Sequence, residues 1–285
     1  MFRIALRQLR WTIIKPEFVI CVIIGLMGYI FDLIRYVRFS FYLNQPLNIL
    51  EPYVASSSNY VTATISVFAL LFLISDVPYN AGDDSFVLMR TSFRGWVLAK
   101  TMYVFAFCII YNLAIIIISL IFAAPFSYLH GLWSEPAVTM SFKDPFLSVN
   151  MYEISFYAPE ILTNLTPVQS AMHSFLLTTL YHISLSIVLL SLKIVVEHKY
   201  ISLAVVYIIH ALGYLPMLII VGIRPFSLFA NSLLNCHILN GENGTLALPT
   251  LKISYCMFSG IILATLLFLF SYVSIKKNIS GGYHG

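Results

Sequence analysis

Long apolar runs alternate with short polar segments along the whole chain. The runs cover residues 18–34, 60–75, 101–125, 170–196, 201–223 and 253–275. A helix needs about 20 apolar residues to cross the hydrocarbon of a bilayer, and flanking Ser, Thr and Tyr extend the two shortest runs. None of the runs carries the polar face that a helix of a soluble core would have. The pattern predicts an all-α integral membrane protein in which six transmembrane helices form a single domain, residues 1–285.

The N-terminal segment, residues 1–16, has a different pattern. Its apolar positions recur at helical spacing, and its basic positions form a separate stripe: Phe2, Leu6, Leu9 and Ile13, and Arg3, Arg7 and Arg10, respectively. This predicts an amphipathic helix in the plane of the membrane interface, with its arginines toward anionic headgroups. Two roles are compatible with it: a basic anchor, and a lever that touches a cytosolic partner.

A charged segment, Ser75–Lys100, separates the second and third runs. Asp83 and Asp84 come first, and Arg90 and Arg94 come last, which is the order that a helix dipole favours. The apolar residues of this segment lie at i, i+3 and i+7 and form one narrow edge: Phe86, Met89 and Phe93. We expect a short amphipathic helix from Asp83 to Phe93, ended by Gly95 before Trp96 anchors the next span at the interface.

Composition and charge agree with membrane insertion. The chain is 60% hydrophobic and 10% charged, with a mean hydropathy of +0.89, whereas soluble domains have about 25% charged residues. Of the 16 Lys and Arg residues, eleven fall in segments on the N-terminal side of the membrane and five in the opposite segments. The positive-inside rule therefore predicts that both termini are cytosolic. The net charge of +4 reflects this topology and does not indicate a nucleic-acid partner.

The candidate chemistry does not indicate an enzyme. Of the four cysteines, only Cys236 lies outside the runs, so no disulfide framework is indicated. Asp and Glu are nearly absent from the runs, so paired carboxylates for acid–base work are not indicated, and the sequence lacks the spacings of common metal sites. We expect no catalytic residue and no metal site in this chain.

Three polar residues lie in the middle of runs: Asn112, His182 and His210. Polar side chains inside a membrane are candidates for function, so each could line a substrate path. The alternative is an interhelical hydrogen bond worth about 1 kcal/mol or less.

Polar residues also mark the ends of two runs. Asp32 can pair with Arg35 one turn further along the helix. Thr166, Pro167 and Gln169 form a capping-box pattern with proline at the first helical position. We therefore expect the fourth helix to begin there, outside the membrane. The later segment Arg224–His237 is apolar but too short to span, and we expect it to fold back on the membrane as a re-entrant or interfacial helix pair.

Several short motifs resemble one bacterial branch of the type-2 ABC export permeases. They are Ser75-Asp76-Val77-Pro78, Leu88-Met89-Arg90-Thr91, Trp96, Lys100, the stretch Leu165–Met172 and the terminal Ser274–Lys277. The basic N-terminal helix and the layout of six spans are also similar. The chain departs from the pattern at Ala99, where a glycine is expected before the lysine.

This resemblance implies a function and a set of partners. Permeases of this family pair with a second permease subunit, identical or different, and with cytosolic ATPase subunits that bind ATP and Mg. They export hydrophobic or amphipathic molecules such as peptides, drugs or lipids across the bacterial plasma membrane. The first cytosolic loop forms the coupling helix that docks on the ATPase, which here implies Asp76, Asp83, Asp84, Phe86, Met89, Arg90, Phe93, Arg94 and Trp96. The alternative is a polytopic membrane protein without an ATPase, either a lipid-modifying enzyme or a scaffold.

Overall fold

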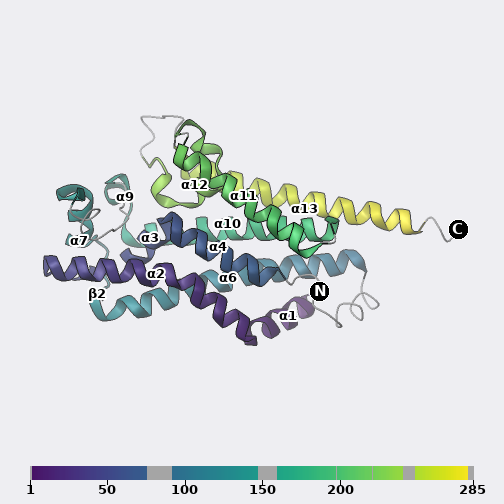
Figure 1. Ribbon diagram of the computed structural model, residues 1–285, viewed down its shortest axis with the longest axis horizontal. Coiled ribbons are helices and arrows are strands. Elements are labelled where there is room, and N and C mark those ends of the chain that lie inside the picture. Colours follow the sequence, from purple (N-terminus) through teal and green to yellow (C-terminus); the bar gives the residue numbers. More distant parts are fainter. Residues whose placement is uncertain are drawn as a thin grey trace.

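Long helices lie side by side along one direction in the computed structural model (Figure 1). The structure describes residues 2–75, 92–146, 159–196, 198–219, 221–239 and 248–281. Each of the six apolar runs holds a helix: α2 (Pro16–Leu43), α4 (Tyr60–Ile74), α6 (Phe93–Ala123), α10 (Pro167–Val196), α11 (Lys199–Ile219) and α13 (Leu251–Gly281).

Four of these helices are long and apolar enough to cross a membrane on their own: α2, α6, α10 and α13. Helix α4 qualifies only together with α3 (Glu51–Ser58), from which it is bent by 80°. The apolar stretch of α11 is shorter, Lys199–Tyr214. Within the described residues, the fold is therefore a mostly helical one with four helices, or five with the bent pair, that can cross a membrane.

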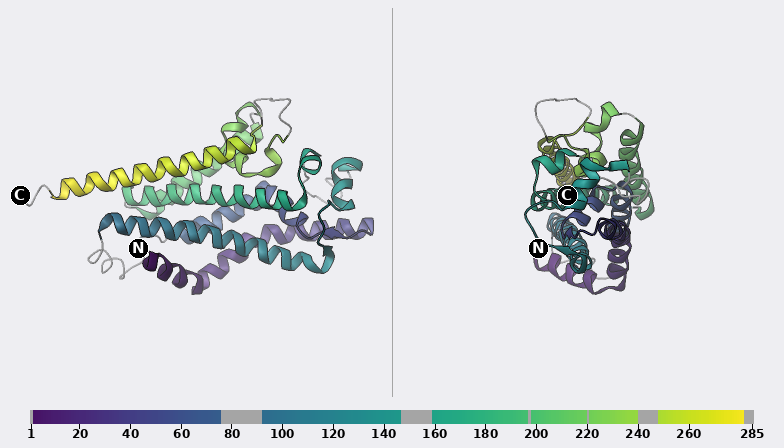
Figure 2. Two further views of the ribbon diagram at one scale, coloured as in Figure 1. Left: turned by 180° about the vertical axis from the view of Figure 1, so that it is seen from behind. Right: turned by 90° about the vertical axis from the view of Figure 1, so that its left-hand side faces the viewer.

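The amphipathic N-terminal helix is present as α1 (Phe2–Ile14). Its Ala5 and Leu9 are buried, and it packs along α6. The Tyr103 hydroxyl of α6 donates a hydrogen bond of 3.0 Å to Thr12 Oγ1 of α1. This packing fixes α1 at an angle to α2, near the end of the bundle where α6 begins (Figures 1 and 2).

Short elements gather toward the opposite end, on the left of Figure 1. They are β1 (Leu47–Asn48), η1 (Ala124–Phe126), β2 (Ser127–Tyr128), α7 (Glu135–Val138), the π-helix η2 (Thr139–Lys143), α9 (Pro159–Asn164), η3 (Val221–Phe226), α12 (Leu228–Ser232) and η4 (Leu234–Cys236). Strands β1 and β2 form a parallel pair with Leu47 opposite Ser127, a small departure from the all-α prediction. Helix α1 and the C-terminal part of α13 lie toward the right of the same view.

Helices α2 and α4 are in close contact at a glycine. A Cβ atom placed on Gly28 would lie 2.9 Å from the Cα of Thr62, a distance that side-chain motion cannot relieve. Small residues let membrane helices approach closely and gain van der Waals contact. The packing of α2 on α4 therefore depends on the absence of a side chain at this position.

The capping box at the start of the fourth long helix is confirmed. The Thr166 N–H donates to Gln169 Oε1 at 3.0 Å, and the Gln169 N–H donates to Thr166 Oγ1 at 3.3 Å. Helix α10 begins at Pro167, the residue that the pattern indicates. The reciprocal bonds satisfy backbone donors that the first turn of a helix leaves unpaired.

The expectation that Gly95 ends a helix was wrong. Helix α6 begins at Phe93 and runs through Gly95, because Ser92 caps it by accepting a 3.3 Å hydrogen bond from the Gly95 N–H. Phe93 therefore starts the long helix instead of closing the preceding one. Helix α2 also continues to Leu43, beyond the end of the first apolar run at residue 34.

The segment Arg224–His237 folds into short helical turns around α12. Within it, Phe229, Ala230, Asn231 and Ser232 are buried, and α12 contacts α10, α11 and α13. The Asn231 side chain donates to the Pro225 carbonyl at 2.7 Å. The segment thus packs on the ends of three long helices. It consists of short helical turns and not of the expected pair of helices.

Candidate functional site

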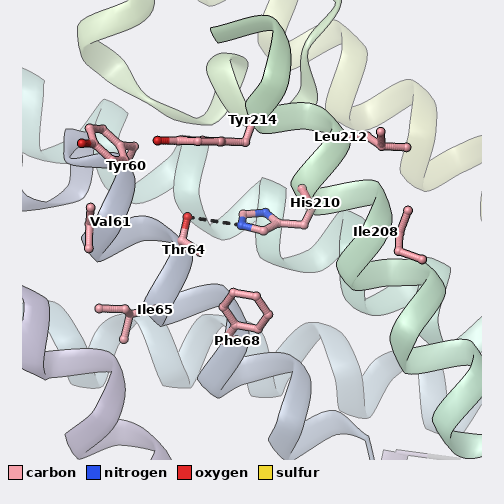
Figure 3. A pocket seen from close by; sticks show the side chains of 10 residues that line it. Tyr60, Val61, Thr64, Ile65, Phe68, Ile208, His210, Leu212 and Tyr214 are labelled. Carbon is pink, nitrogen blue, oxygen red and sulfur yellow. Dashed lines mark hydrogen bonds between the residues drawn. The ribbon is translucent and has the colours of Figure 1, made fainter. Parts of the chain in front are cut away.

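A pocket of about 600 Å³ lies between α4 and α11 (Figure 3). Its walls are mostly apolar and aromatic. Helix α4 contributes Tyr60, Val61, Thr64, Ile65 and Phe68, and α11 contributes Ile208, His210, Ala211, Leu212 and Tyr214. The side chains of Phe68, Ile208 and Leu212 are 42%, 56% and 57% exposed, so apolar surface is available here to a ligand or a partner.

The polar centre of the pocket is His210. Its Nε2 lies 3.3 Å from Thr64 Oγ1 on α4, and its Nδ1 lies 2.6 Å from the Tyr181 hydroxyl on α10. Figure 3 shows His210 and Thr64 pointing toward one another across the pocket. Hydrogen bonds of both ring nitrogens thus join three helices, which confirms the expectation of interhelical hydrogen bonding for this residue.

Aromatic contacts hold the histidine ring in place. The ring lies edge-on to Phe229 at 5.0 Å between centroids and to Phe68 at 5.9 Å. Tyr60 and Tyr214 pair across one end of the pocket at 5.5 Å. The arrangement offers an apolar cleft with a few polar side chains, His210, Thr64 and the two tyrosines, which suits an amphipathic molecule with a small polar group.

The other two predicted path residues do not line this pocket. The Asn112 side chain donates to the Cys108 carbonyl of its own helix at 2.8 Å, so the expected interhelical bond was wrong for this residue. His182 is 1% exposed, and neither of its ring nitrogens has a hydrogen-bond partner among the described residues. Its ring packs 6.0 Å from that of Tyr111. Of the three candidates, only His210 reaches the pocket.

Asp32 has more partners than the sequence indicated. The expected ion pair with Arg35 is present at 3.6 Å. Asp32 also accepts hydrogen bonds from Asn59 Nδ2 at 3.2 Å and from Thr62 Oγ1 at 3.0 Å. The carboxylate therefore ties α2 to the start of α4, beside the close contact at Gly28.

Sequence reasoning missed Glu51, which is fully buried at the start of α3. Its Oε1 accepts from the Ser134 N–H at 2.6 Å, and its Oε2 accepts from Ser134 Oγ at 2.6 Å and from the Asn48 N–H at 3.1 Å. These bonds join α3 to the N-cap of α7. Ser134 lies 83 residues further along the chain, and no local pattern could have paired the two.

Most of the predicted coupling residues lie outside the described part of the chain: Asp76, Asp83, Asp84, Phe86, Met89 and Arg90. The backbone of Phe93 opens α6. Arg94 Nη2 donates to Ser274 Oγ of α13 at 2.9 Å. Trp96 is buried, at 6% exposed, and Lys100 Nζ lies 5.5 Å from its ring.

Sequence reasoning treated Lys193 only as a marker of topology, yet this residue is fully buried. Its Nζ donates to the Ile74 carbonyl at 3.3 Å and to the Ser75 carbonyl. A cation at the C-terminal end of a helix is stabilised by the helix dipole and by unpaired carbonyls. Lys193 thus links α10 to the end of α4, next to the predicted coupling segment.

Comparison of the chain with models of protein families, with curated proteins and with solved structures finds no match.

Proposed function

We propose that the chain is the transmembrane permease subunit of an ATP-binding cassette exporter. In this proposal it moves a hydrophobic or amphipathic molecule, such as a peptide, a drug or a lipid, out of the cell. The support comes from the motif resemblance around Ser75–Lys100 and from the pocket between α4 and α11. ATP and Mg would bind to a separate cytosolic ATPase, and the energy would reach this chain through the coupling segment.

The observation that carries the proposal is the composition of the pocket. Its volume of about 600 Å³ is within the range of drug-sized ligand sites. Its walls combine exposed apolar side chains with the polar pair of His210 and Thr64. Such a site favours a molecule with a large apolar part and a small polar group over a strongly charged one.

The contacts of α4 suggest how movement would reach the pocket. Helix α4 ends where the coupling segment begins, and Lys193 holds that end to α10. Further along, α10 carries Tyr181, which hydrogen bonds to His210 on the opposite wall. A displacement of the coupling segment by an ATPase would therefore act on α4 and α10 together and change the distance between the pocket walls.

The proposed assembly has two permease subunits and two ATPase subunits in a bacterial plasma membrane. The proposed topology has six crossings with both termini and the coupling segment in the cytosol. The bias of Lys and Arg supports it, as does the location of α1 and of the C-terminal part of α13 toward the same end of the bundle in Figure 1. A chain that crosses the membrane an even number of times has both termini on the same side.

The test is to purify the chain with the ATPase encoded by a neighbouring reading frame and to screen amphipathic peptides and lipids for stimulation of ATP hydrolysis. Phe68→Ala should reduce stimulation at least about tenfold, because it removes an aromatic wall of the pocket. Phe72→Ala is the matched control, since Phe72 lies on the same helix, is 59% exposed and does not line the pocket.

Two results would contradict the proposal. Equal stimulation of ATP hydrolysis in the Phe68→Ala and Phe72→Ala variants would show that the pocket is not part of the transport path. A purified chain that binds no ATPase but chemically alters a lipid would support the alternative of a lipid-modifying enzyme.

A further inference from the structure

In the part of the chain that the structure describes, helix α1 packs along α6 through one side. Its Ala5 and Leu9 are 6% and 8% exposed, and Thr12 accepts the hydrogen bond from Tyr103 of α6. Because α1 packs on α6 through this side, the remaining surface of the helix has a fixed orientation. That surface carries both large apolar residues and arginines.

The exposed surface has a basic stripe between two apolar edges. Arg3, Arg7 and Arg10 are exposed, and at about 100° per residue they fall within roughly 60° of one another around the helix. Large apolar side chains accompany them and remain largely exposed: Phe2 61%, Leu6 46%, Trp11 61% and Ile14 68%. Phe2 and Leu6 form the edge on one side of the stripe, Trp11 forms the edge on the other side, and Ile14 lies within the stripe at its C-terminal end.

We propose that this surface of α1 binds acidic phospholipids of the bilayer. The apolar edges would enter the boundary between headgroups and acyl chains, and Arg3 and Arg10 would pair with lipid phosphates. A guanidinium group can bind a phosphate through two parallel hydrogen bonds. A zwitterionic headgroup neutralises its phosphate with its own cation, whereas an acidic headgroup has no such cation and keeps a net negative charge, so arginines should favour the acidic lipid.

The position of α1 favours a lipid over an acidic protein. The helix ends at Ile14, and α2, which is long and apolar enough to cross a membrane, begins at Pro16. The start of α2 therefore places α1 at the membrane surface. An acidic protein surface could pair with the arginines, but it would leave the two apolar edges without a nonpolar environment. This inference does not depend on the proposed transport function.

The test measures which lipid lies next to Trp11. The full chain is reconstituted in phosphatidylcholine vesicles that contain about 30 mol% of either brominated phosphatidylglycerol or brominated phosphatidylcholine. The bromine quenches tryptophan fluorescence at short range. The chain has three tryptophans, so the signal of Trp11 is taken as the difference between the wild-type protein and Trp11→Phe.

Brominated phosphatidylglycerol should quench Trp11 at least about twofold more than brominated phosphatidylcholine does, because each arginine near an acidic surface contributes about a fivefold preference. The double variant Arg3→Gln/Arg10→Gln should lose this difference and still be quenched by both lipids. The matched control is Arg38→Gln/Lys252→Gln, which removes two exposed charges elsewhere and should keep the difference.

Three outcomes would overturn the inference. Equal quenching by the two lipids in the wild-type protein would show no selection for acidic headgroups. If Arg3→Gln/Arg10→Gln kept the stronger quenching by brominated phosphatidylglycerol, residues other than these arginines would cause the preference. Absence of quenching by either lipid would place α1 away from the bilayer and favour a protein partner. The first and third outcomes are read on the wild-type protein and Trp11→Phe alone, so they do not require the charge variants to fold.

Discussion

Replacement of Gly28 by alanine should separate α2 from α4. The new Cβ would lie 2.6 Å from Thr62 Oγ1, 2.8 Å from its Cγ2 and 2.9 Å from its Cα. Because one of these atoms belongs to the backbone, a rotamer change of Thr62 cannot relieve the overlap, and the two helices must move apart. The shift would also strain the hydrogen bond of 3.0 Å from Thr62 Oγ1 to Asp32.

The expected cost follows from three contributions. Overpacking in a core typically costs about 1–3 kcal/mol, and loss of a hydrogen bond to a charged group costs about 1.5–3 kcal/mol. Alanine in place of glycine within a helix stabilises the folded state by about 0.5–1 kcal/mol, which offsets part of this cost. The net free energy of unfolding should therefore fall by about 1.5–5.5 kcal/mol, which at roughly 2 °C per kcal/mol for a chain of this size lowers the unfolding temperature by about 3–10 °C.

The measurement is thermal unfolding in detergent, followed with a dye that becomes fluorescent when it reacts with a thiol. Cys21 and Cys108 are 3% and 0% exposed, so they react only when the bundle opens. Gly260→Ala is the matched control, because nothing lies within 4 Å of its added Cβ. That control should keep the wild-type midpoint or raise it slightly. A Gly28→Ala midpoint equal to that of the control would refute the close packing of α2 on α4.

Three further predictions concern stability and topology. Lys193→Met should lower the thermal midpoint by several degrees, because it leaves two carbonyls at the end of α4 without their buried donor, at about 1–3 kcal/mol in total; a wild-type midpoint would count against this contact. Burial lowers the pKa of His237 from its ordinary value of 6.5 to about 4, so the neutral ring stabilises the fold fully above pH 6.5, and this stabilisation decreases as the pH falls toward 4. Hydrogen exchange of residues 226–238, corrected for its intrinsic pH dependence, should show protection falling by up to about tenfold per pH unit in that range, and His237→Gln should abolish the trend. A cysteine at exposed Leu129 should react with an impermeant thiol reagent from outside intact cells, whereas one at exposed His198 should not; the reverse result would invert the topology.

Local patterns in the sequence were sufficient for several features. The apolar runs indicated where the long helices lie, and the amphipathic N-terminal helix is present. The capping box of Thr166 and Gln169 was predictable because its partners are three residues apart and adopt one common geometry. Asp32 and Arg35 were predictable for the same reason, since they lie one helical turn apart.

Features that depend on distant contacts were not predictable. Glu51 is buried because Ser134 and Asn48 satisfy its carboxylate, and nothing near Glu51 in the sequence indicates these partners. The bonds of His210 to Tyr181 and Thr64 join three helices, whose relative rotation is set by packing. The burial of Lys193 was not predictable either, because its partners are the carbonyls of Ile74 and Ser75 at the end of a distant helix.

The error at Gly95 has a local cause. Glycine often follows the end of a helix, and the preceding charged segment was read as a complete helix. Ser92 instead caps the start of a new helix, and serine is one of the residues preferred at this N-cap position. Within a long helix that is packed on its neighbours, tertiary contacts offset the low intrinsic propensity of one glycine.

Affinity purification of the wild-type chain and two double variants shows whether the chain works with a separate ATPase, as proposed. Phe86→Ala/Arg90→Ala removes two predicted anchors of the coupling segment, and Phe72→Ala/Arg38→Ala removes the same residue types from exposed positions elsewhere. Anchors of this kind contribute about 2 kcal/mol or more each. We predict that the wild-type chain and the control double variant retain the ATPase, and that the coupling variant inserts in the membrane but loses the ATPase. Failure of the wild-type chain to retain the ATPase, or equal retention by all three proteins, would contradict the account.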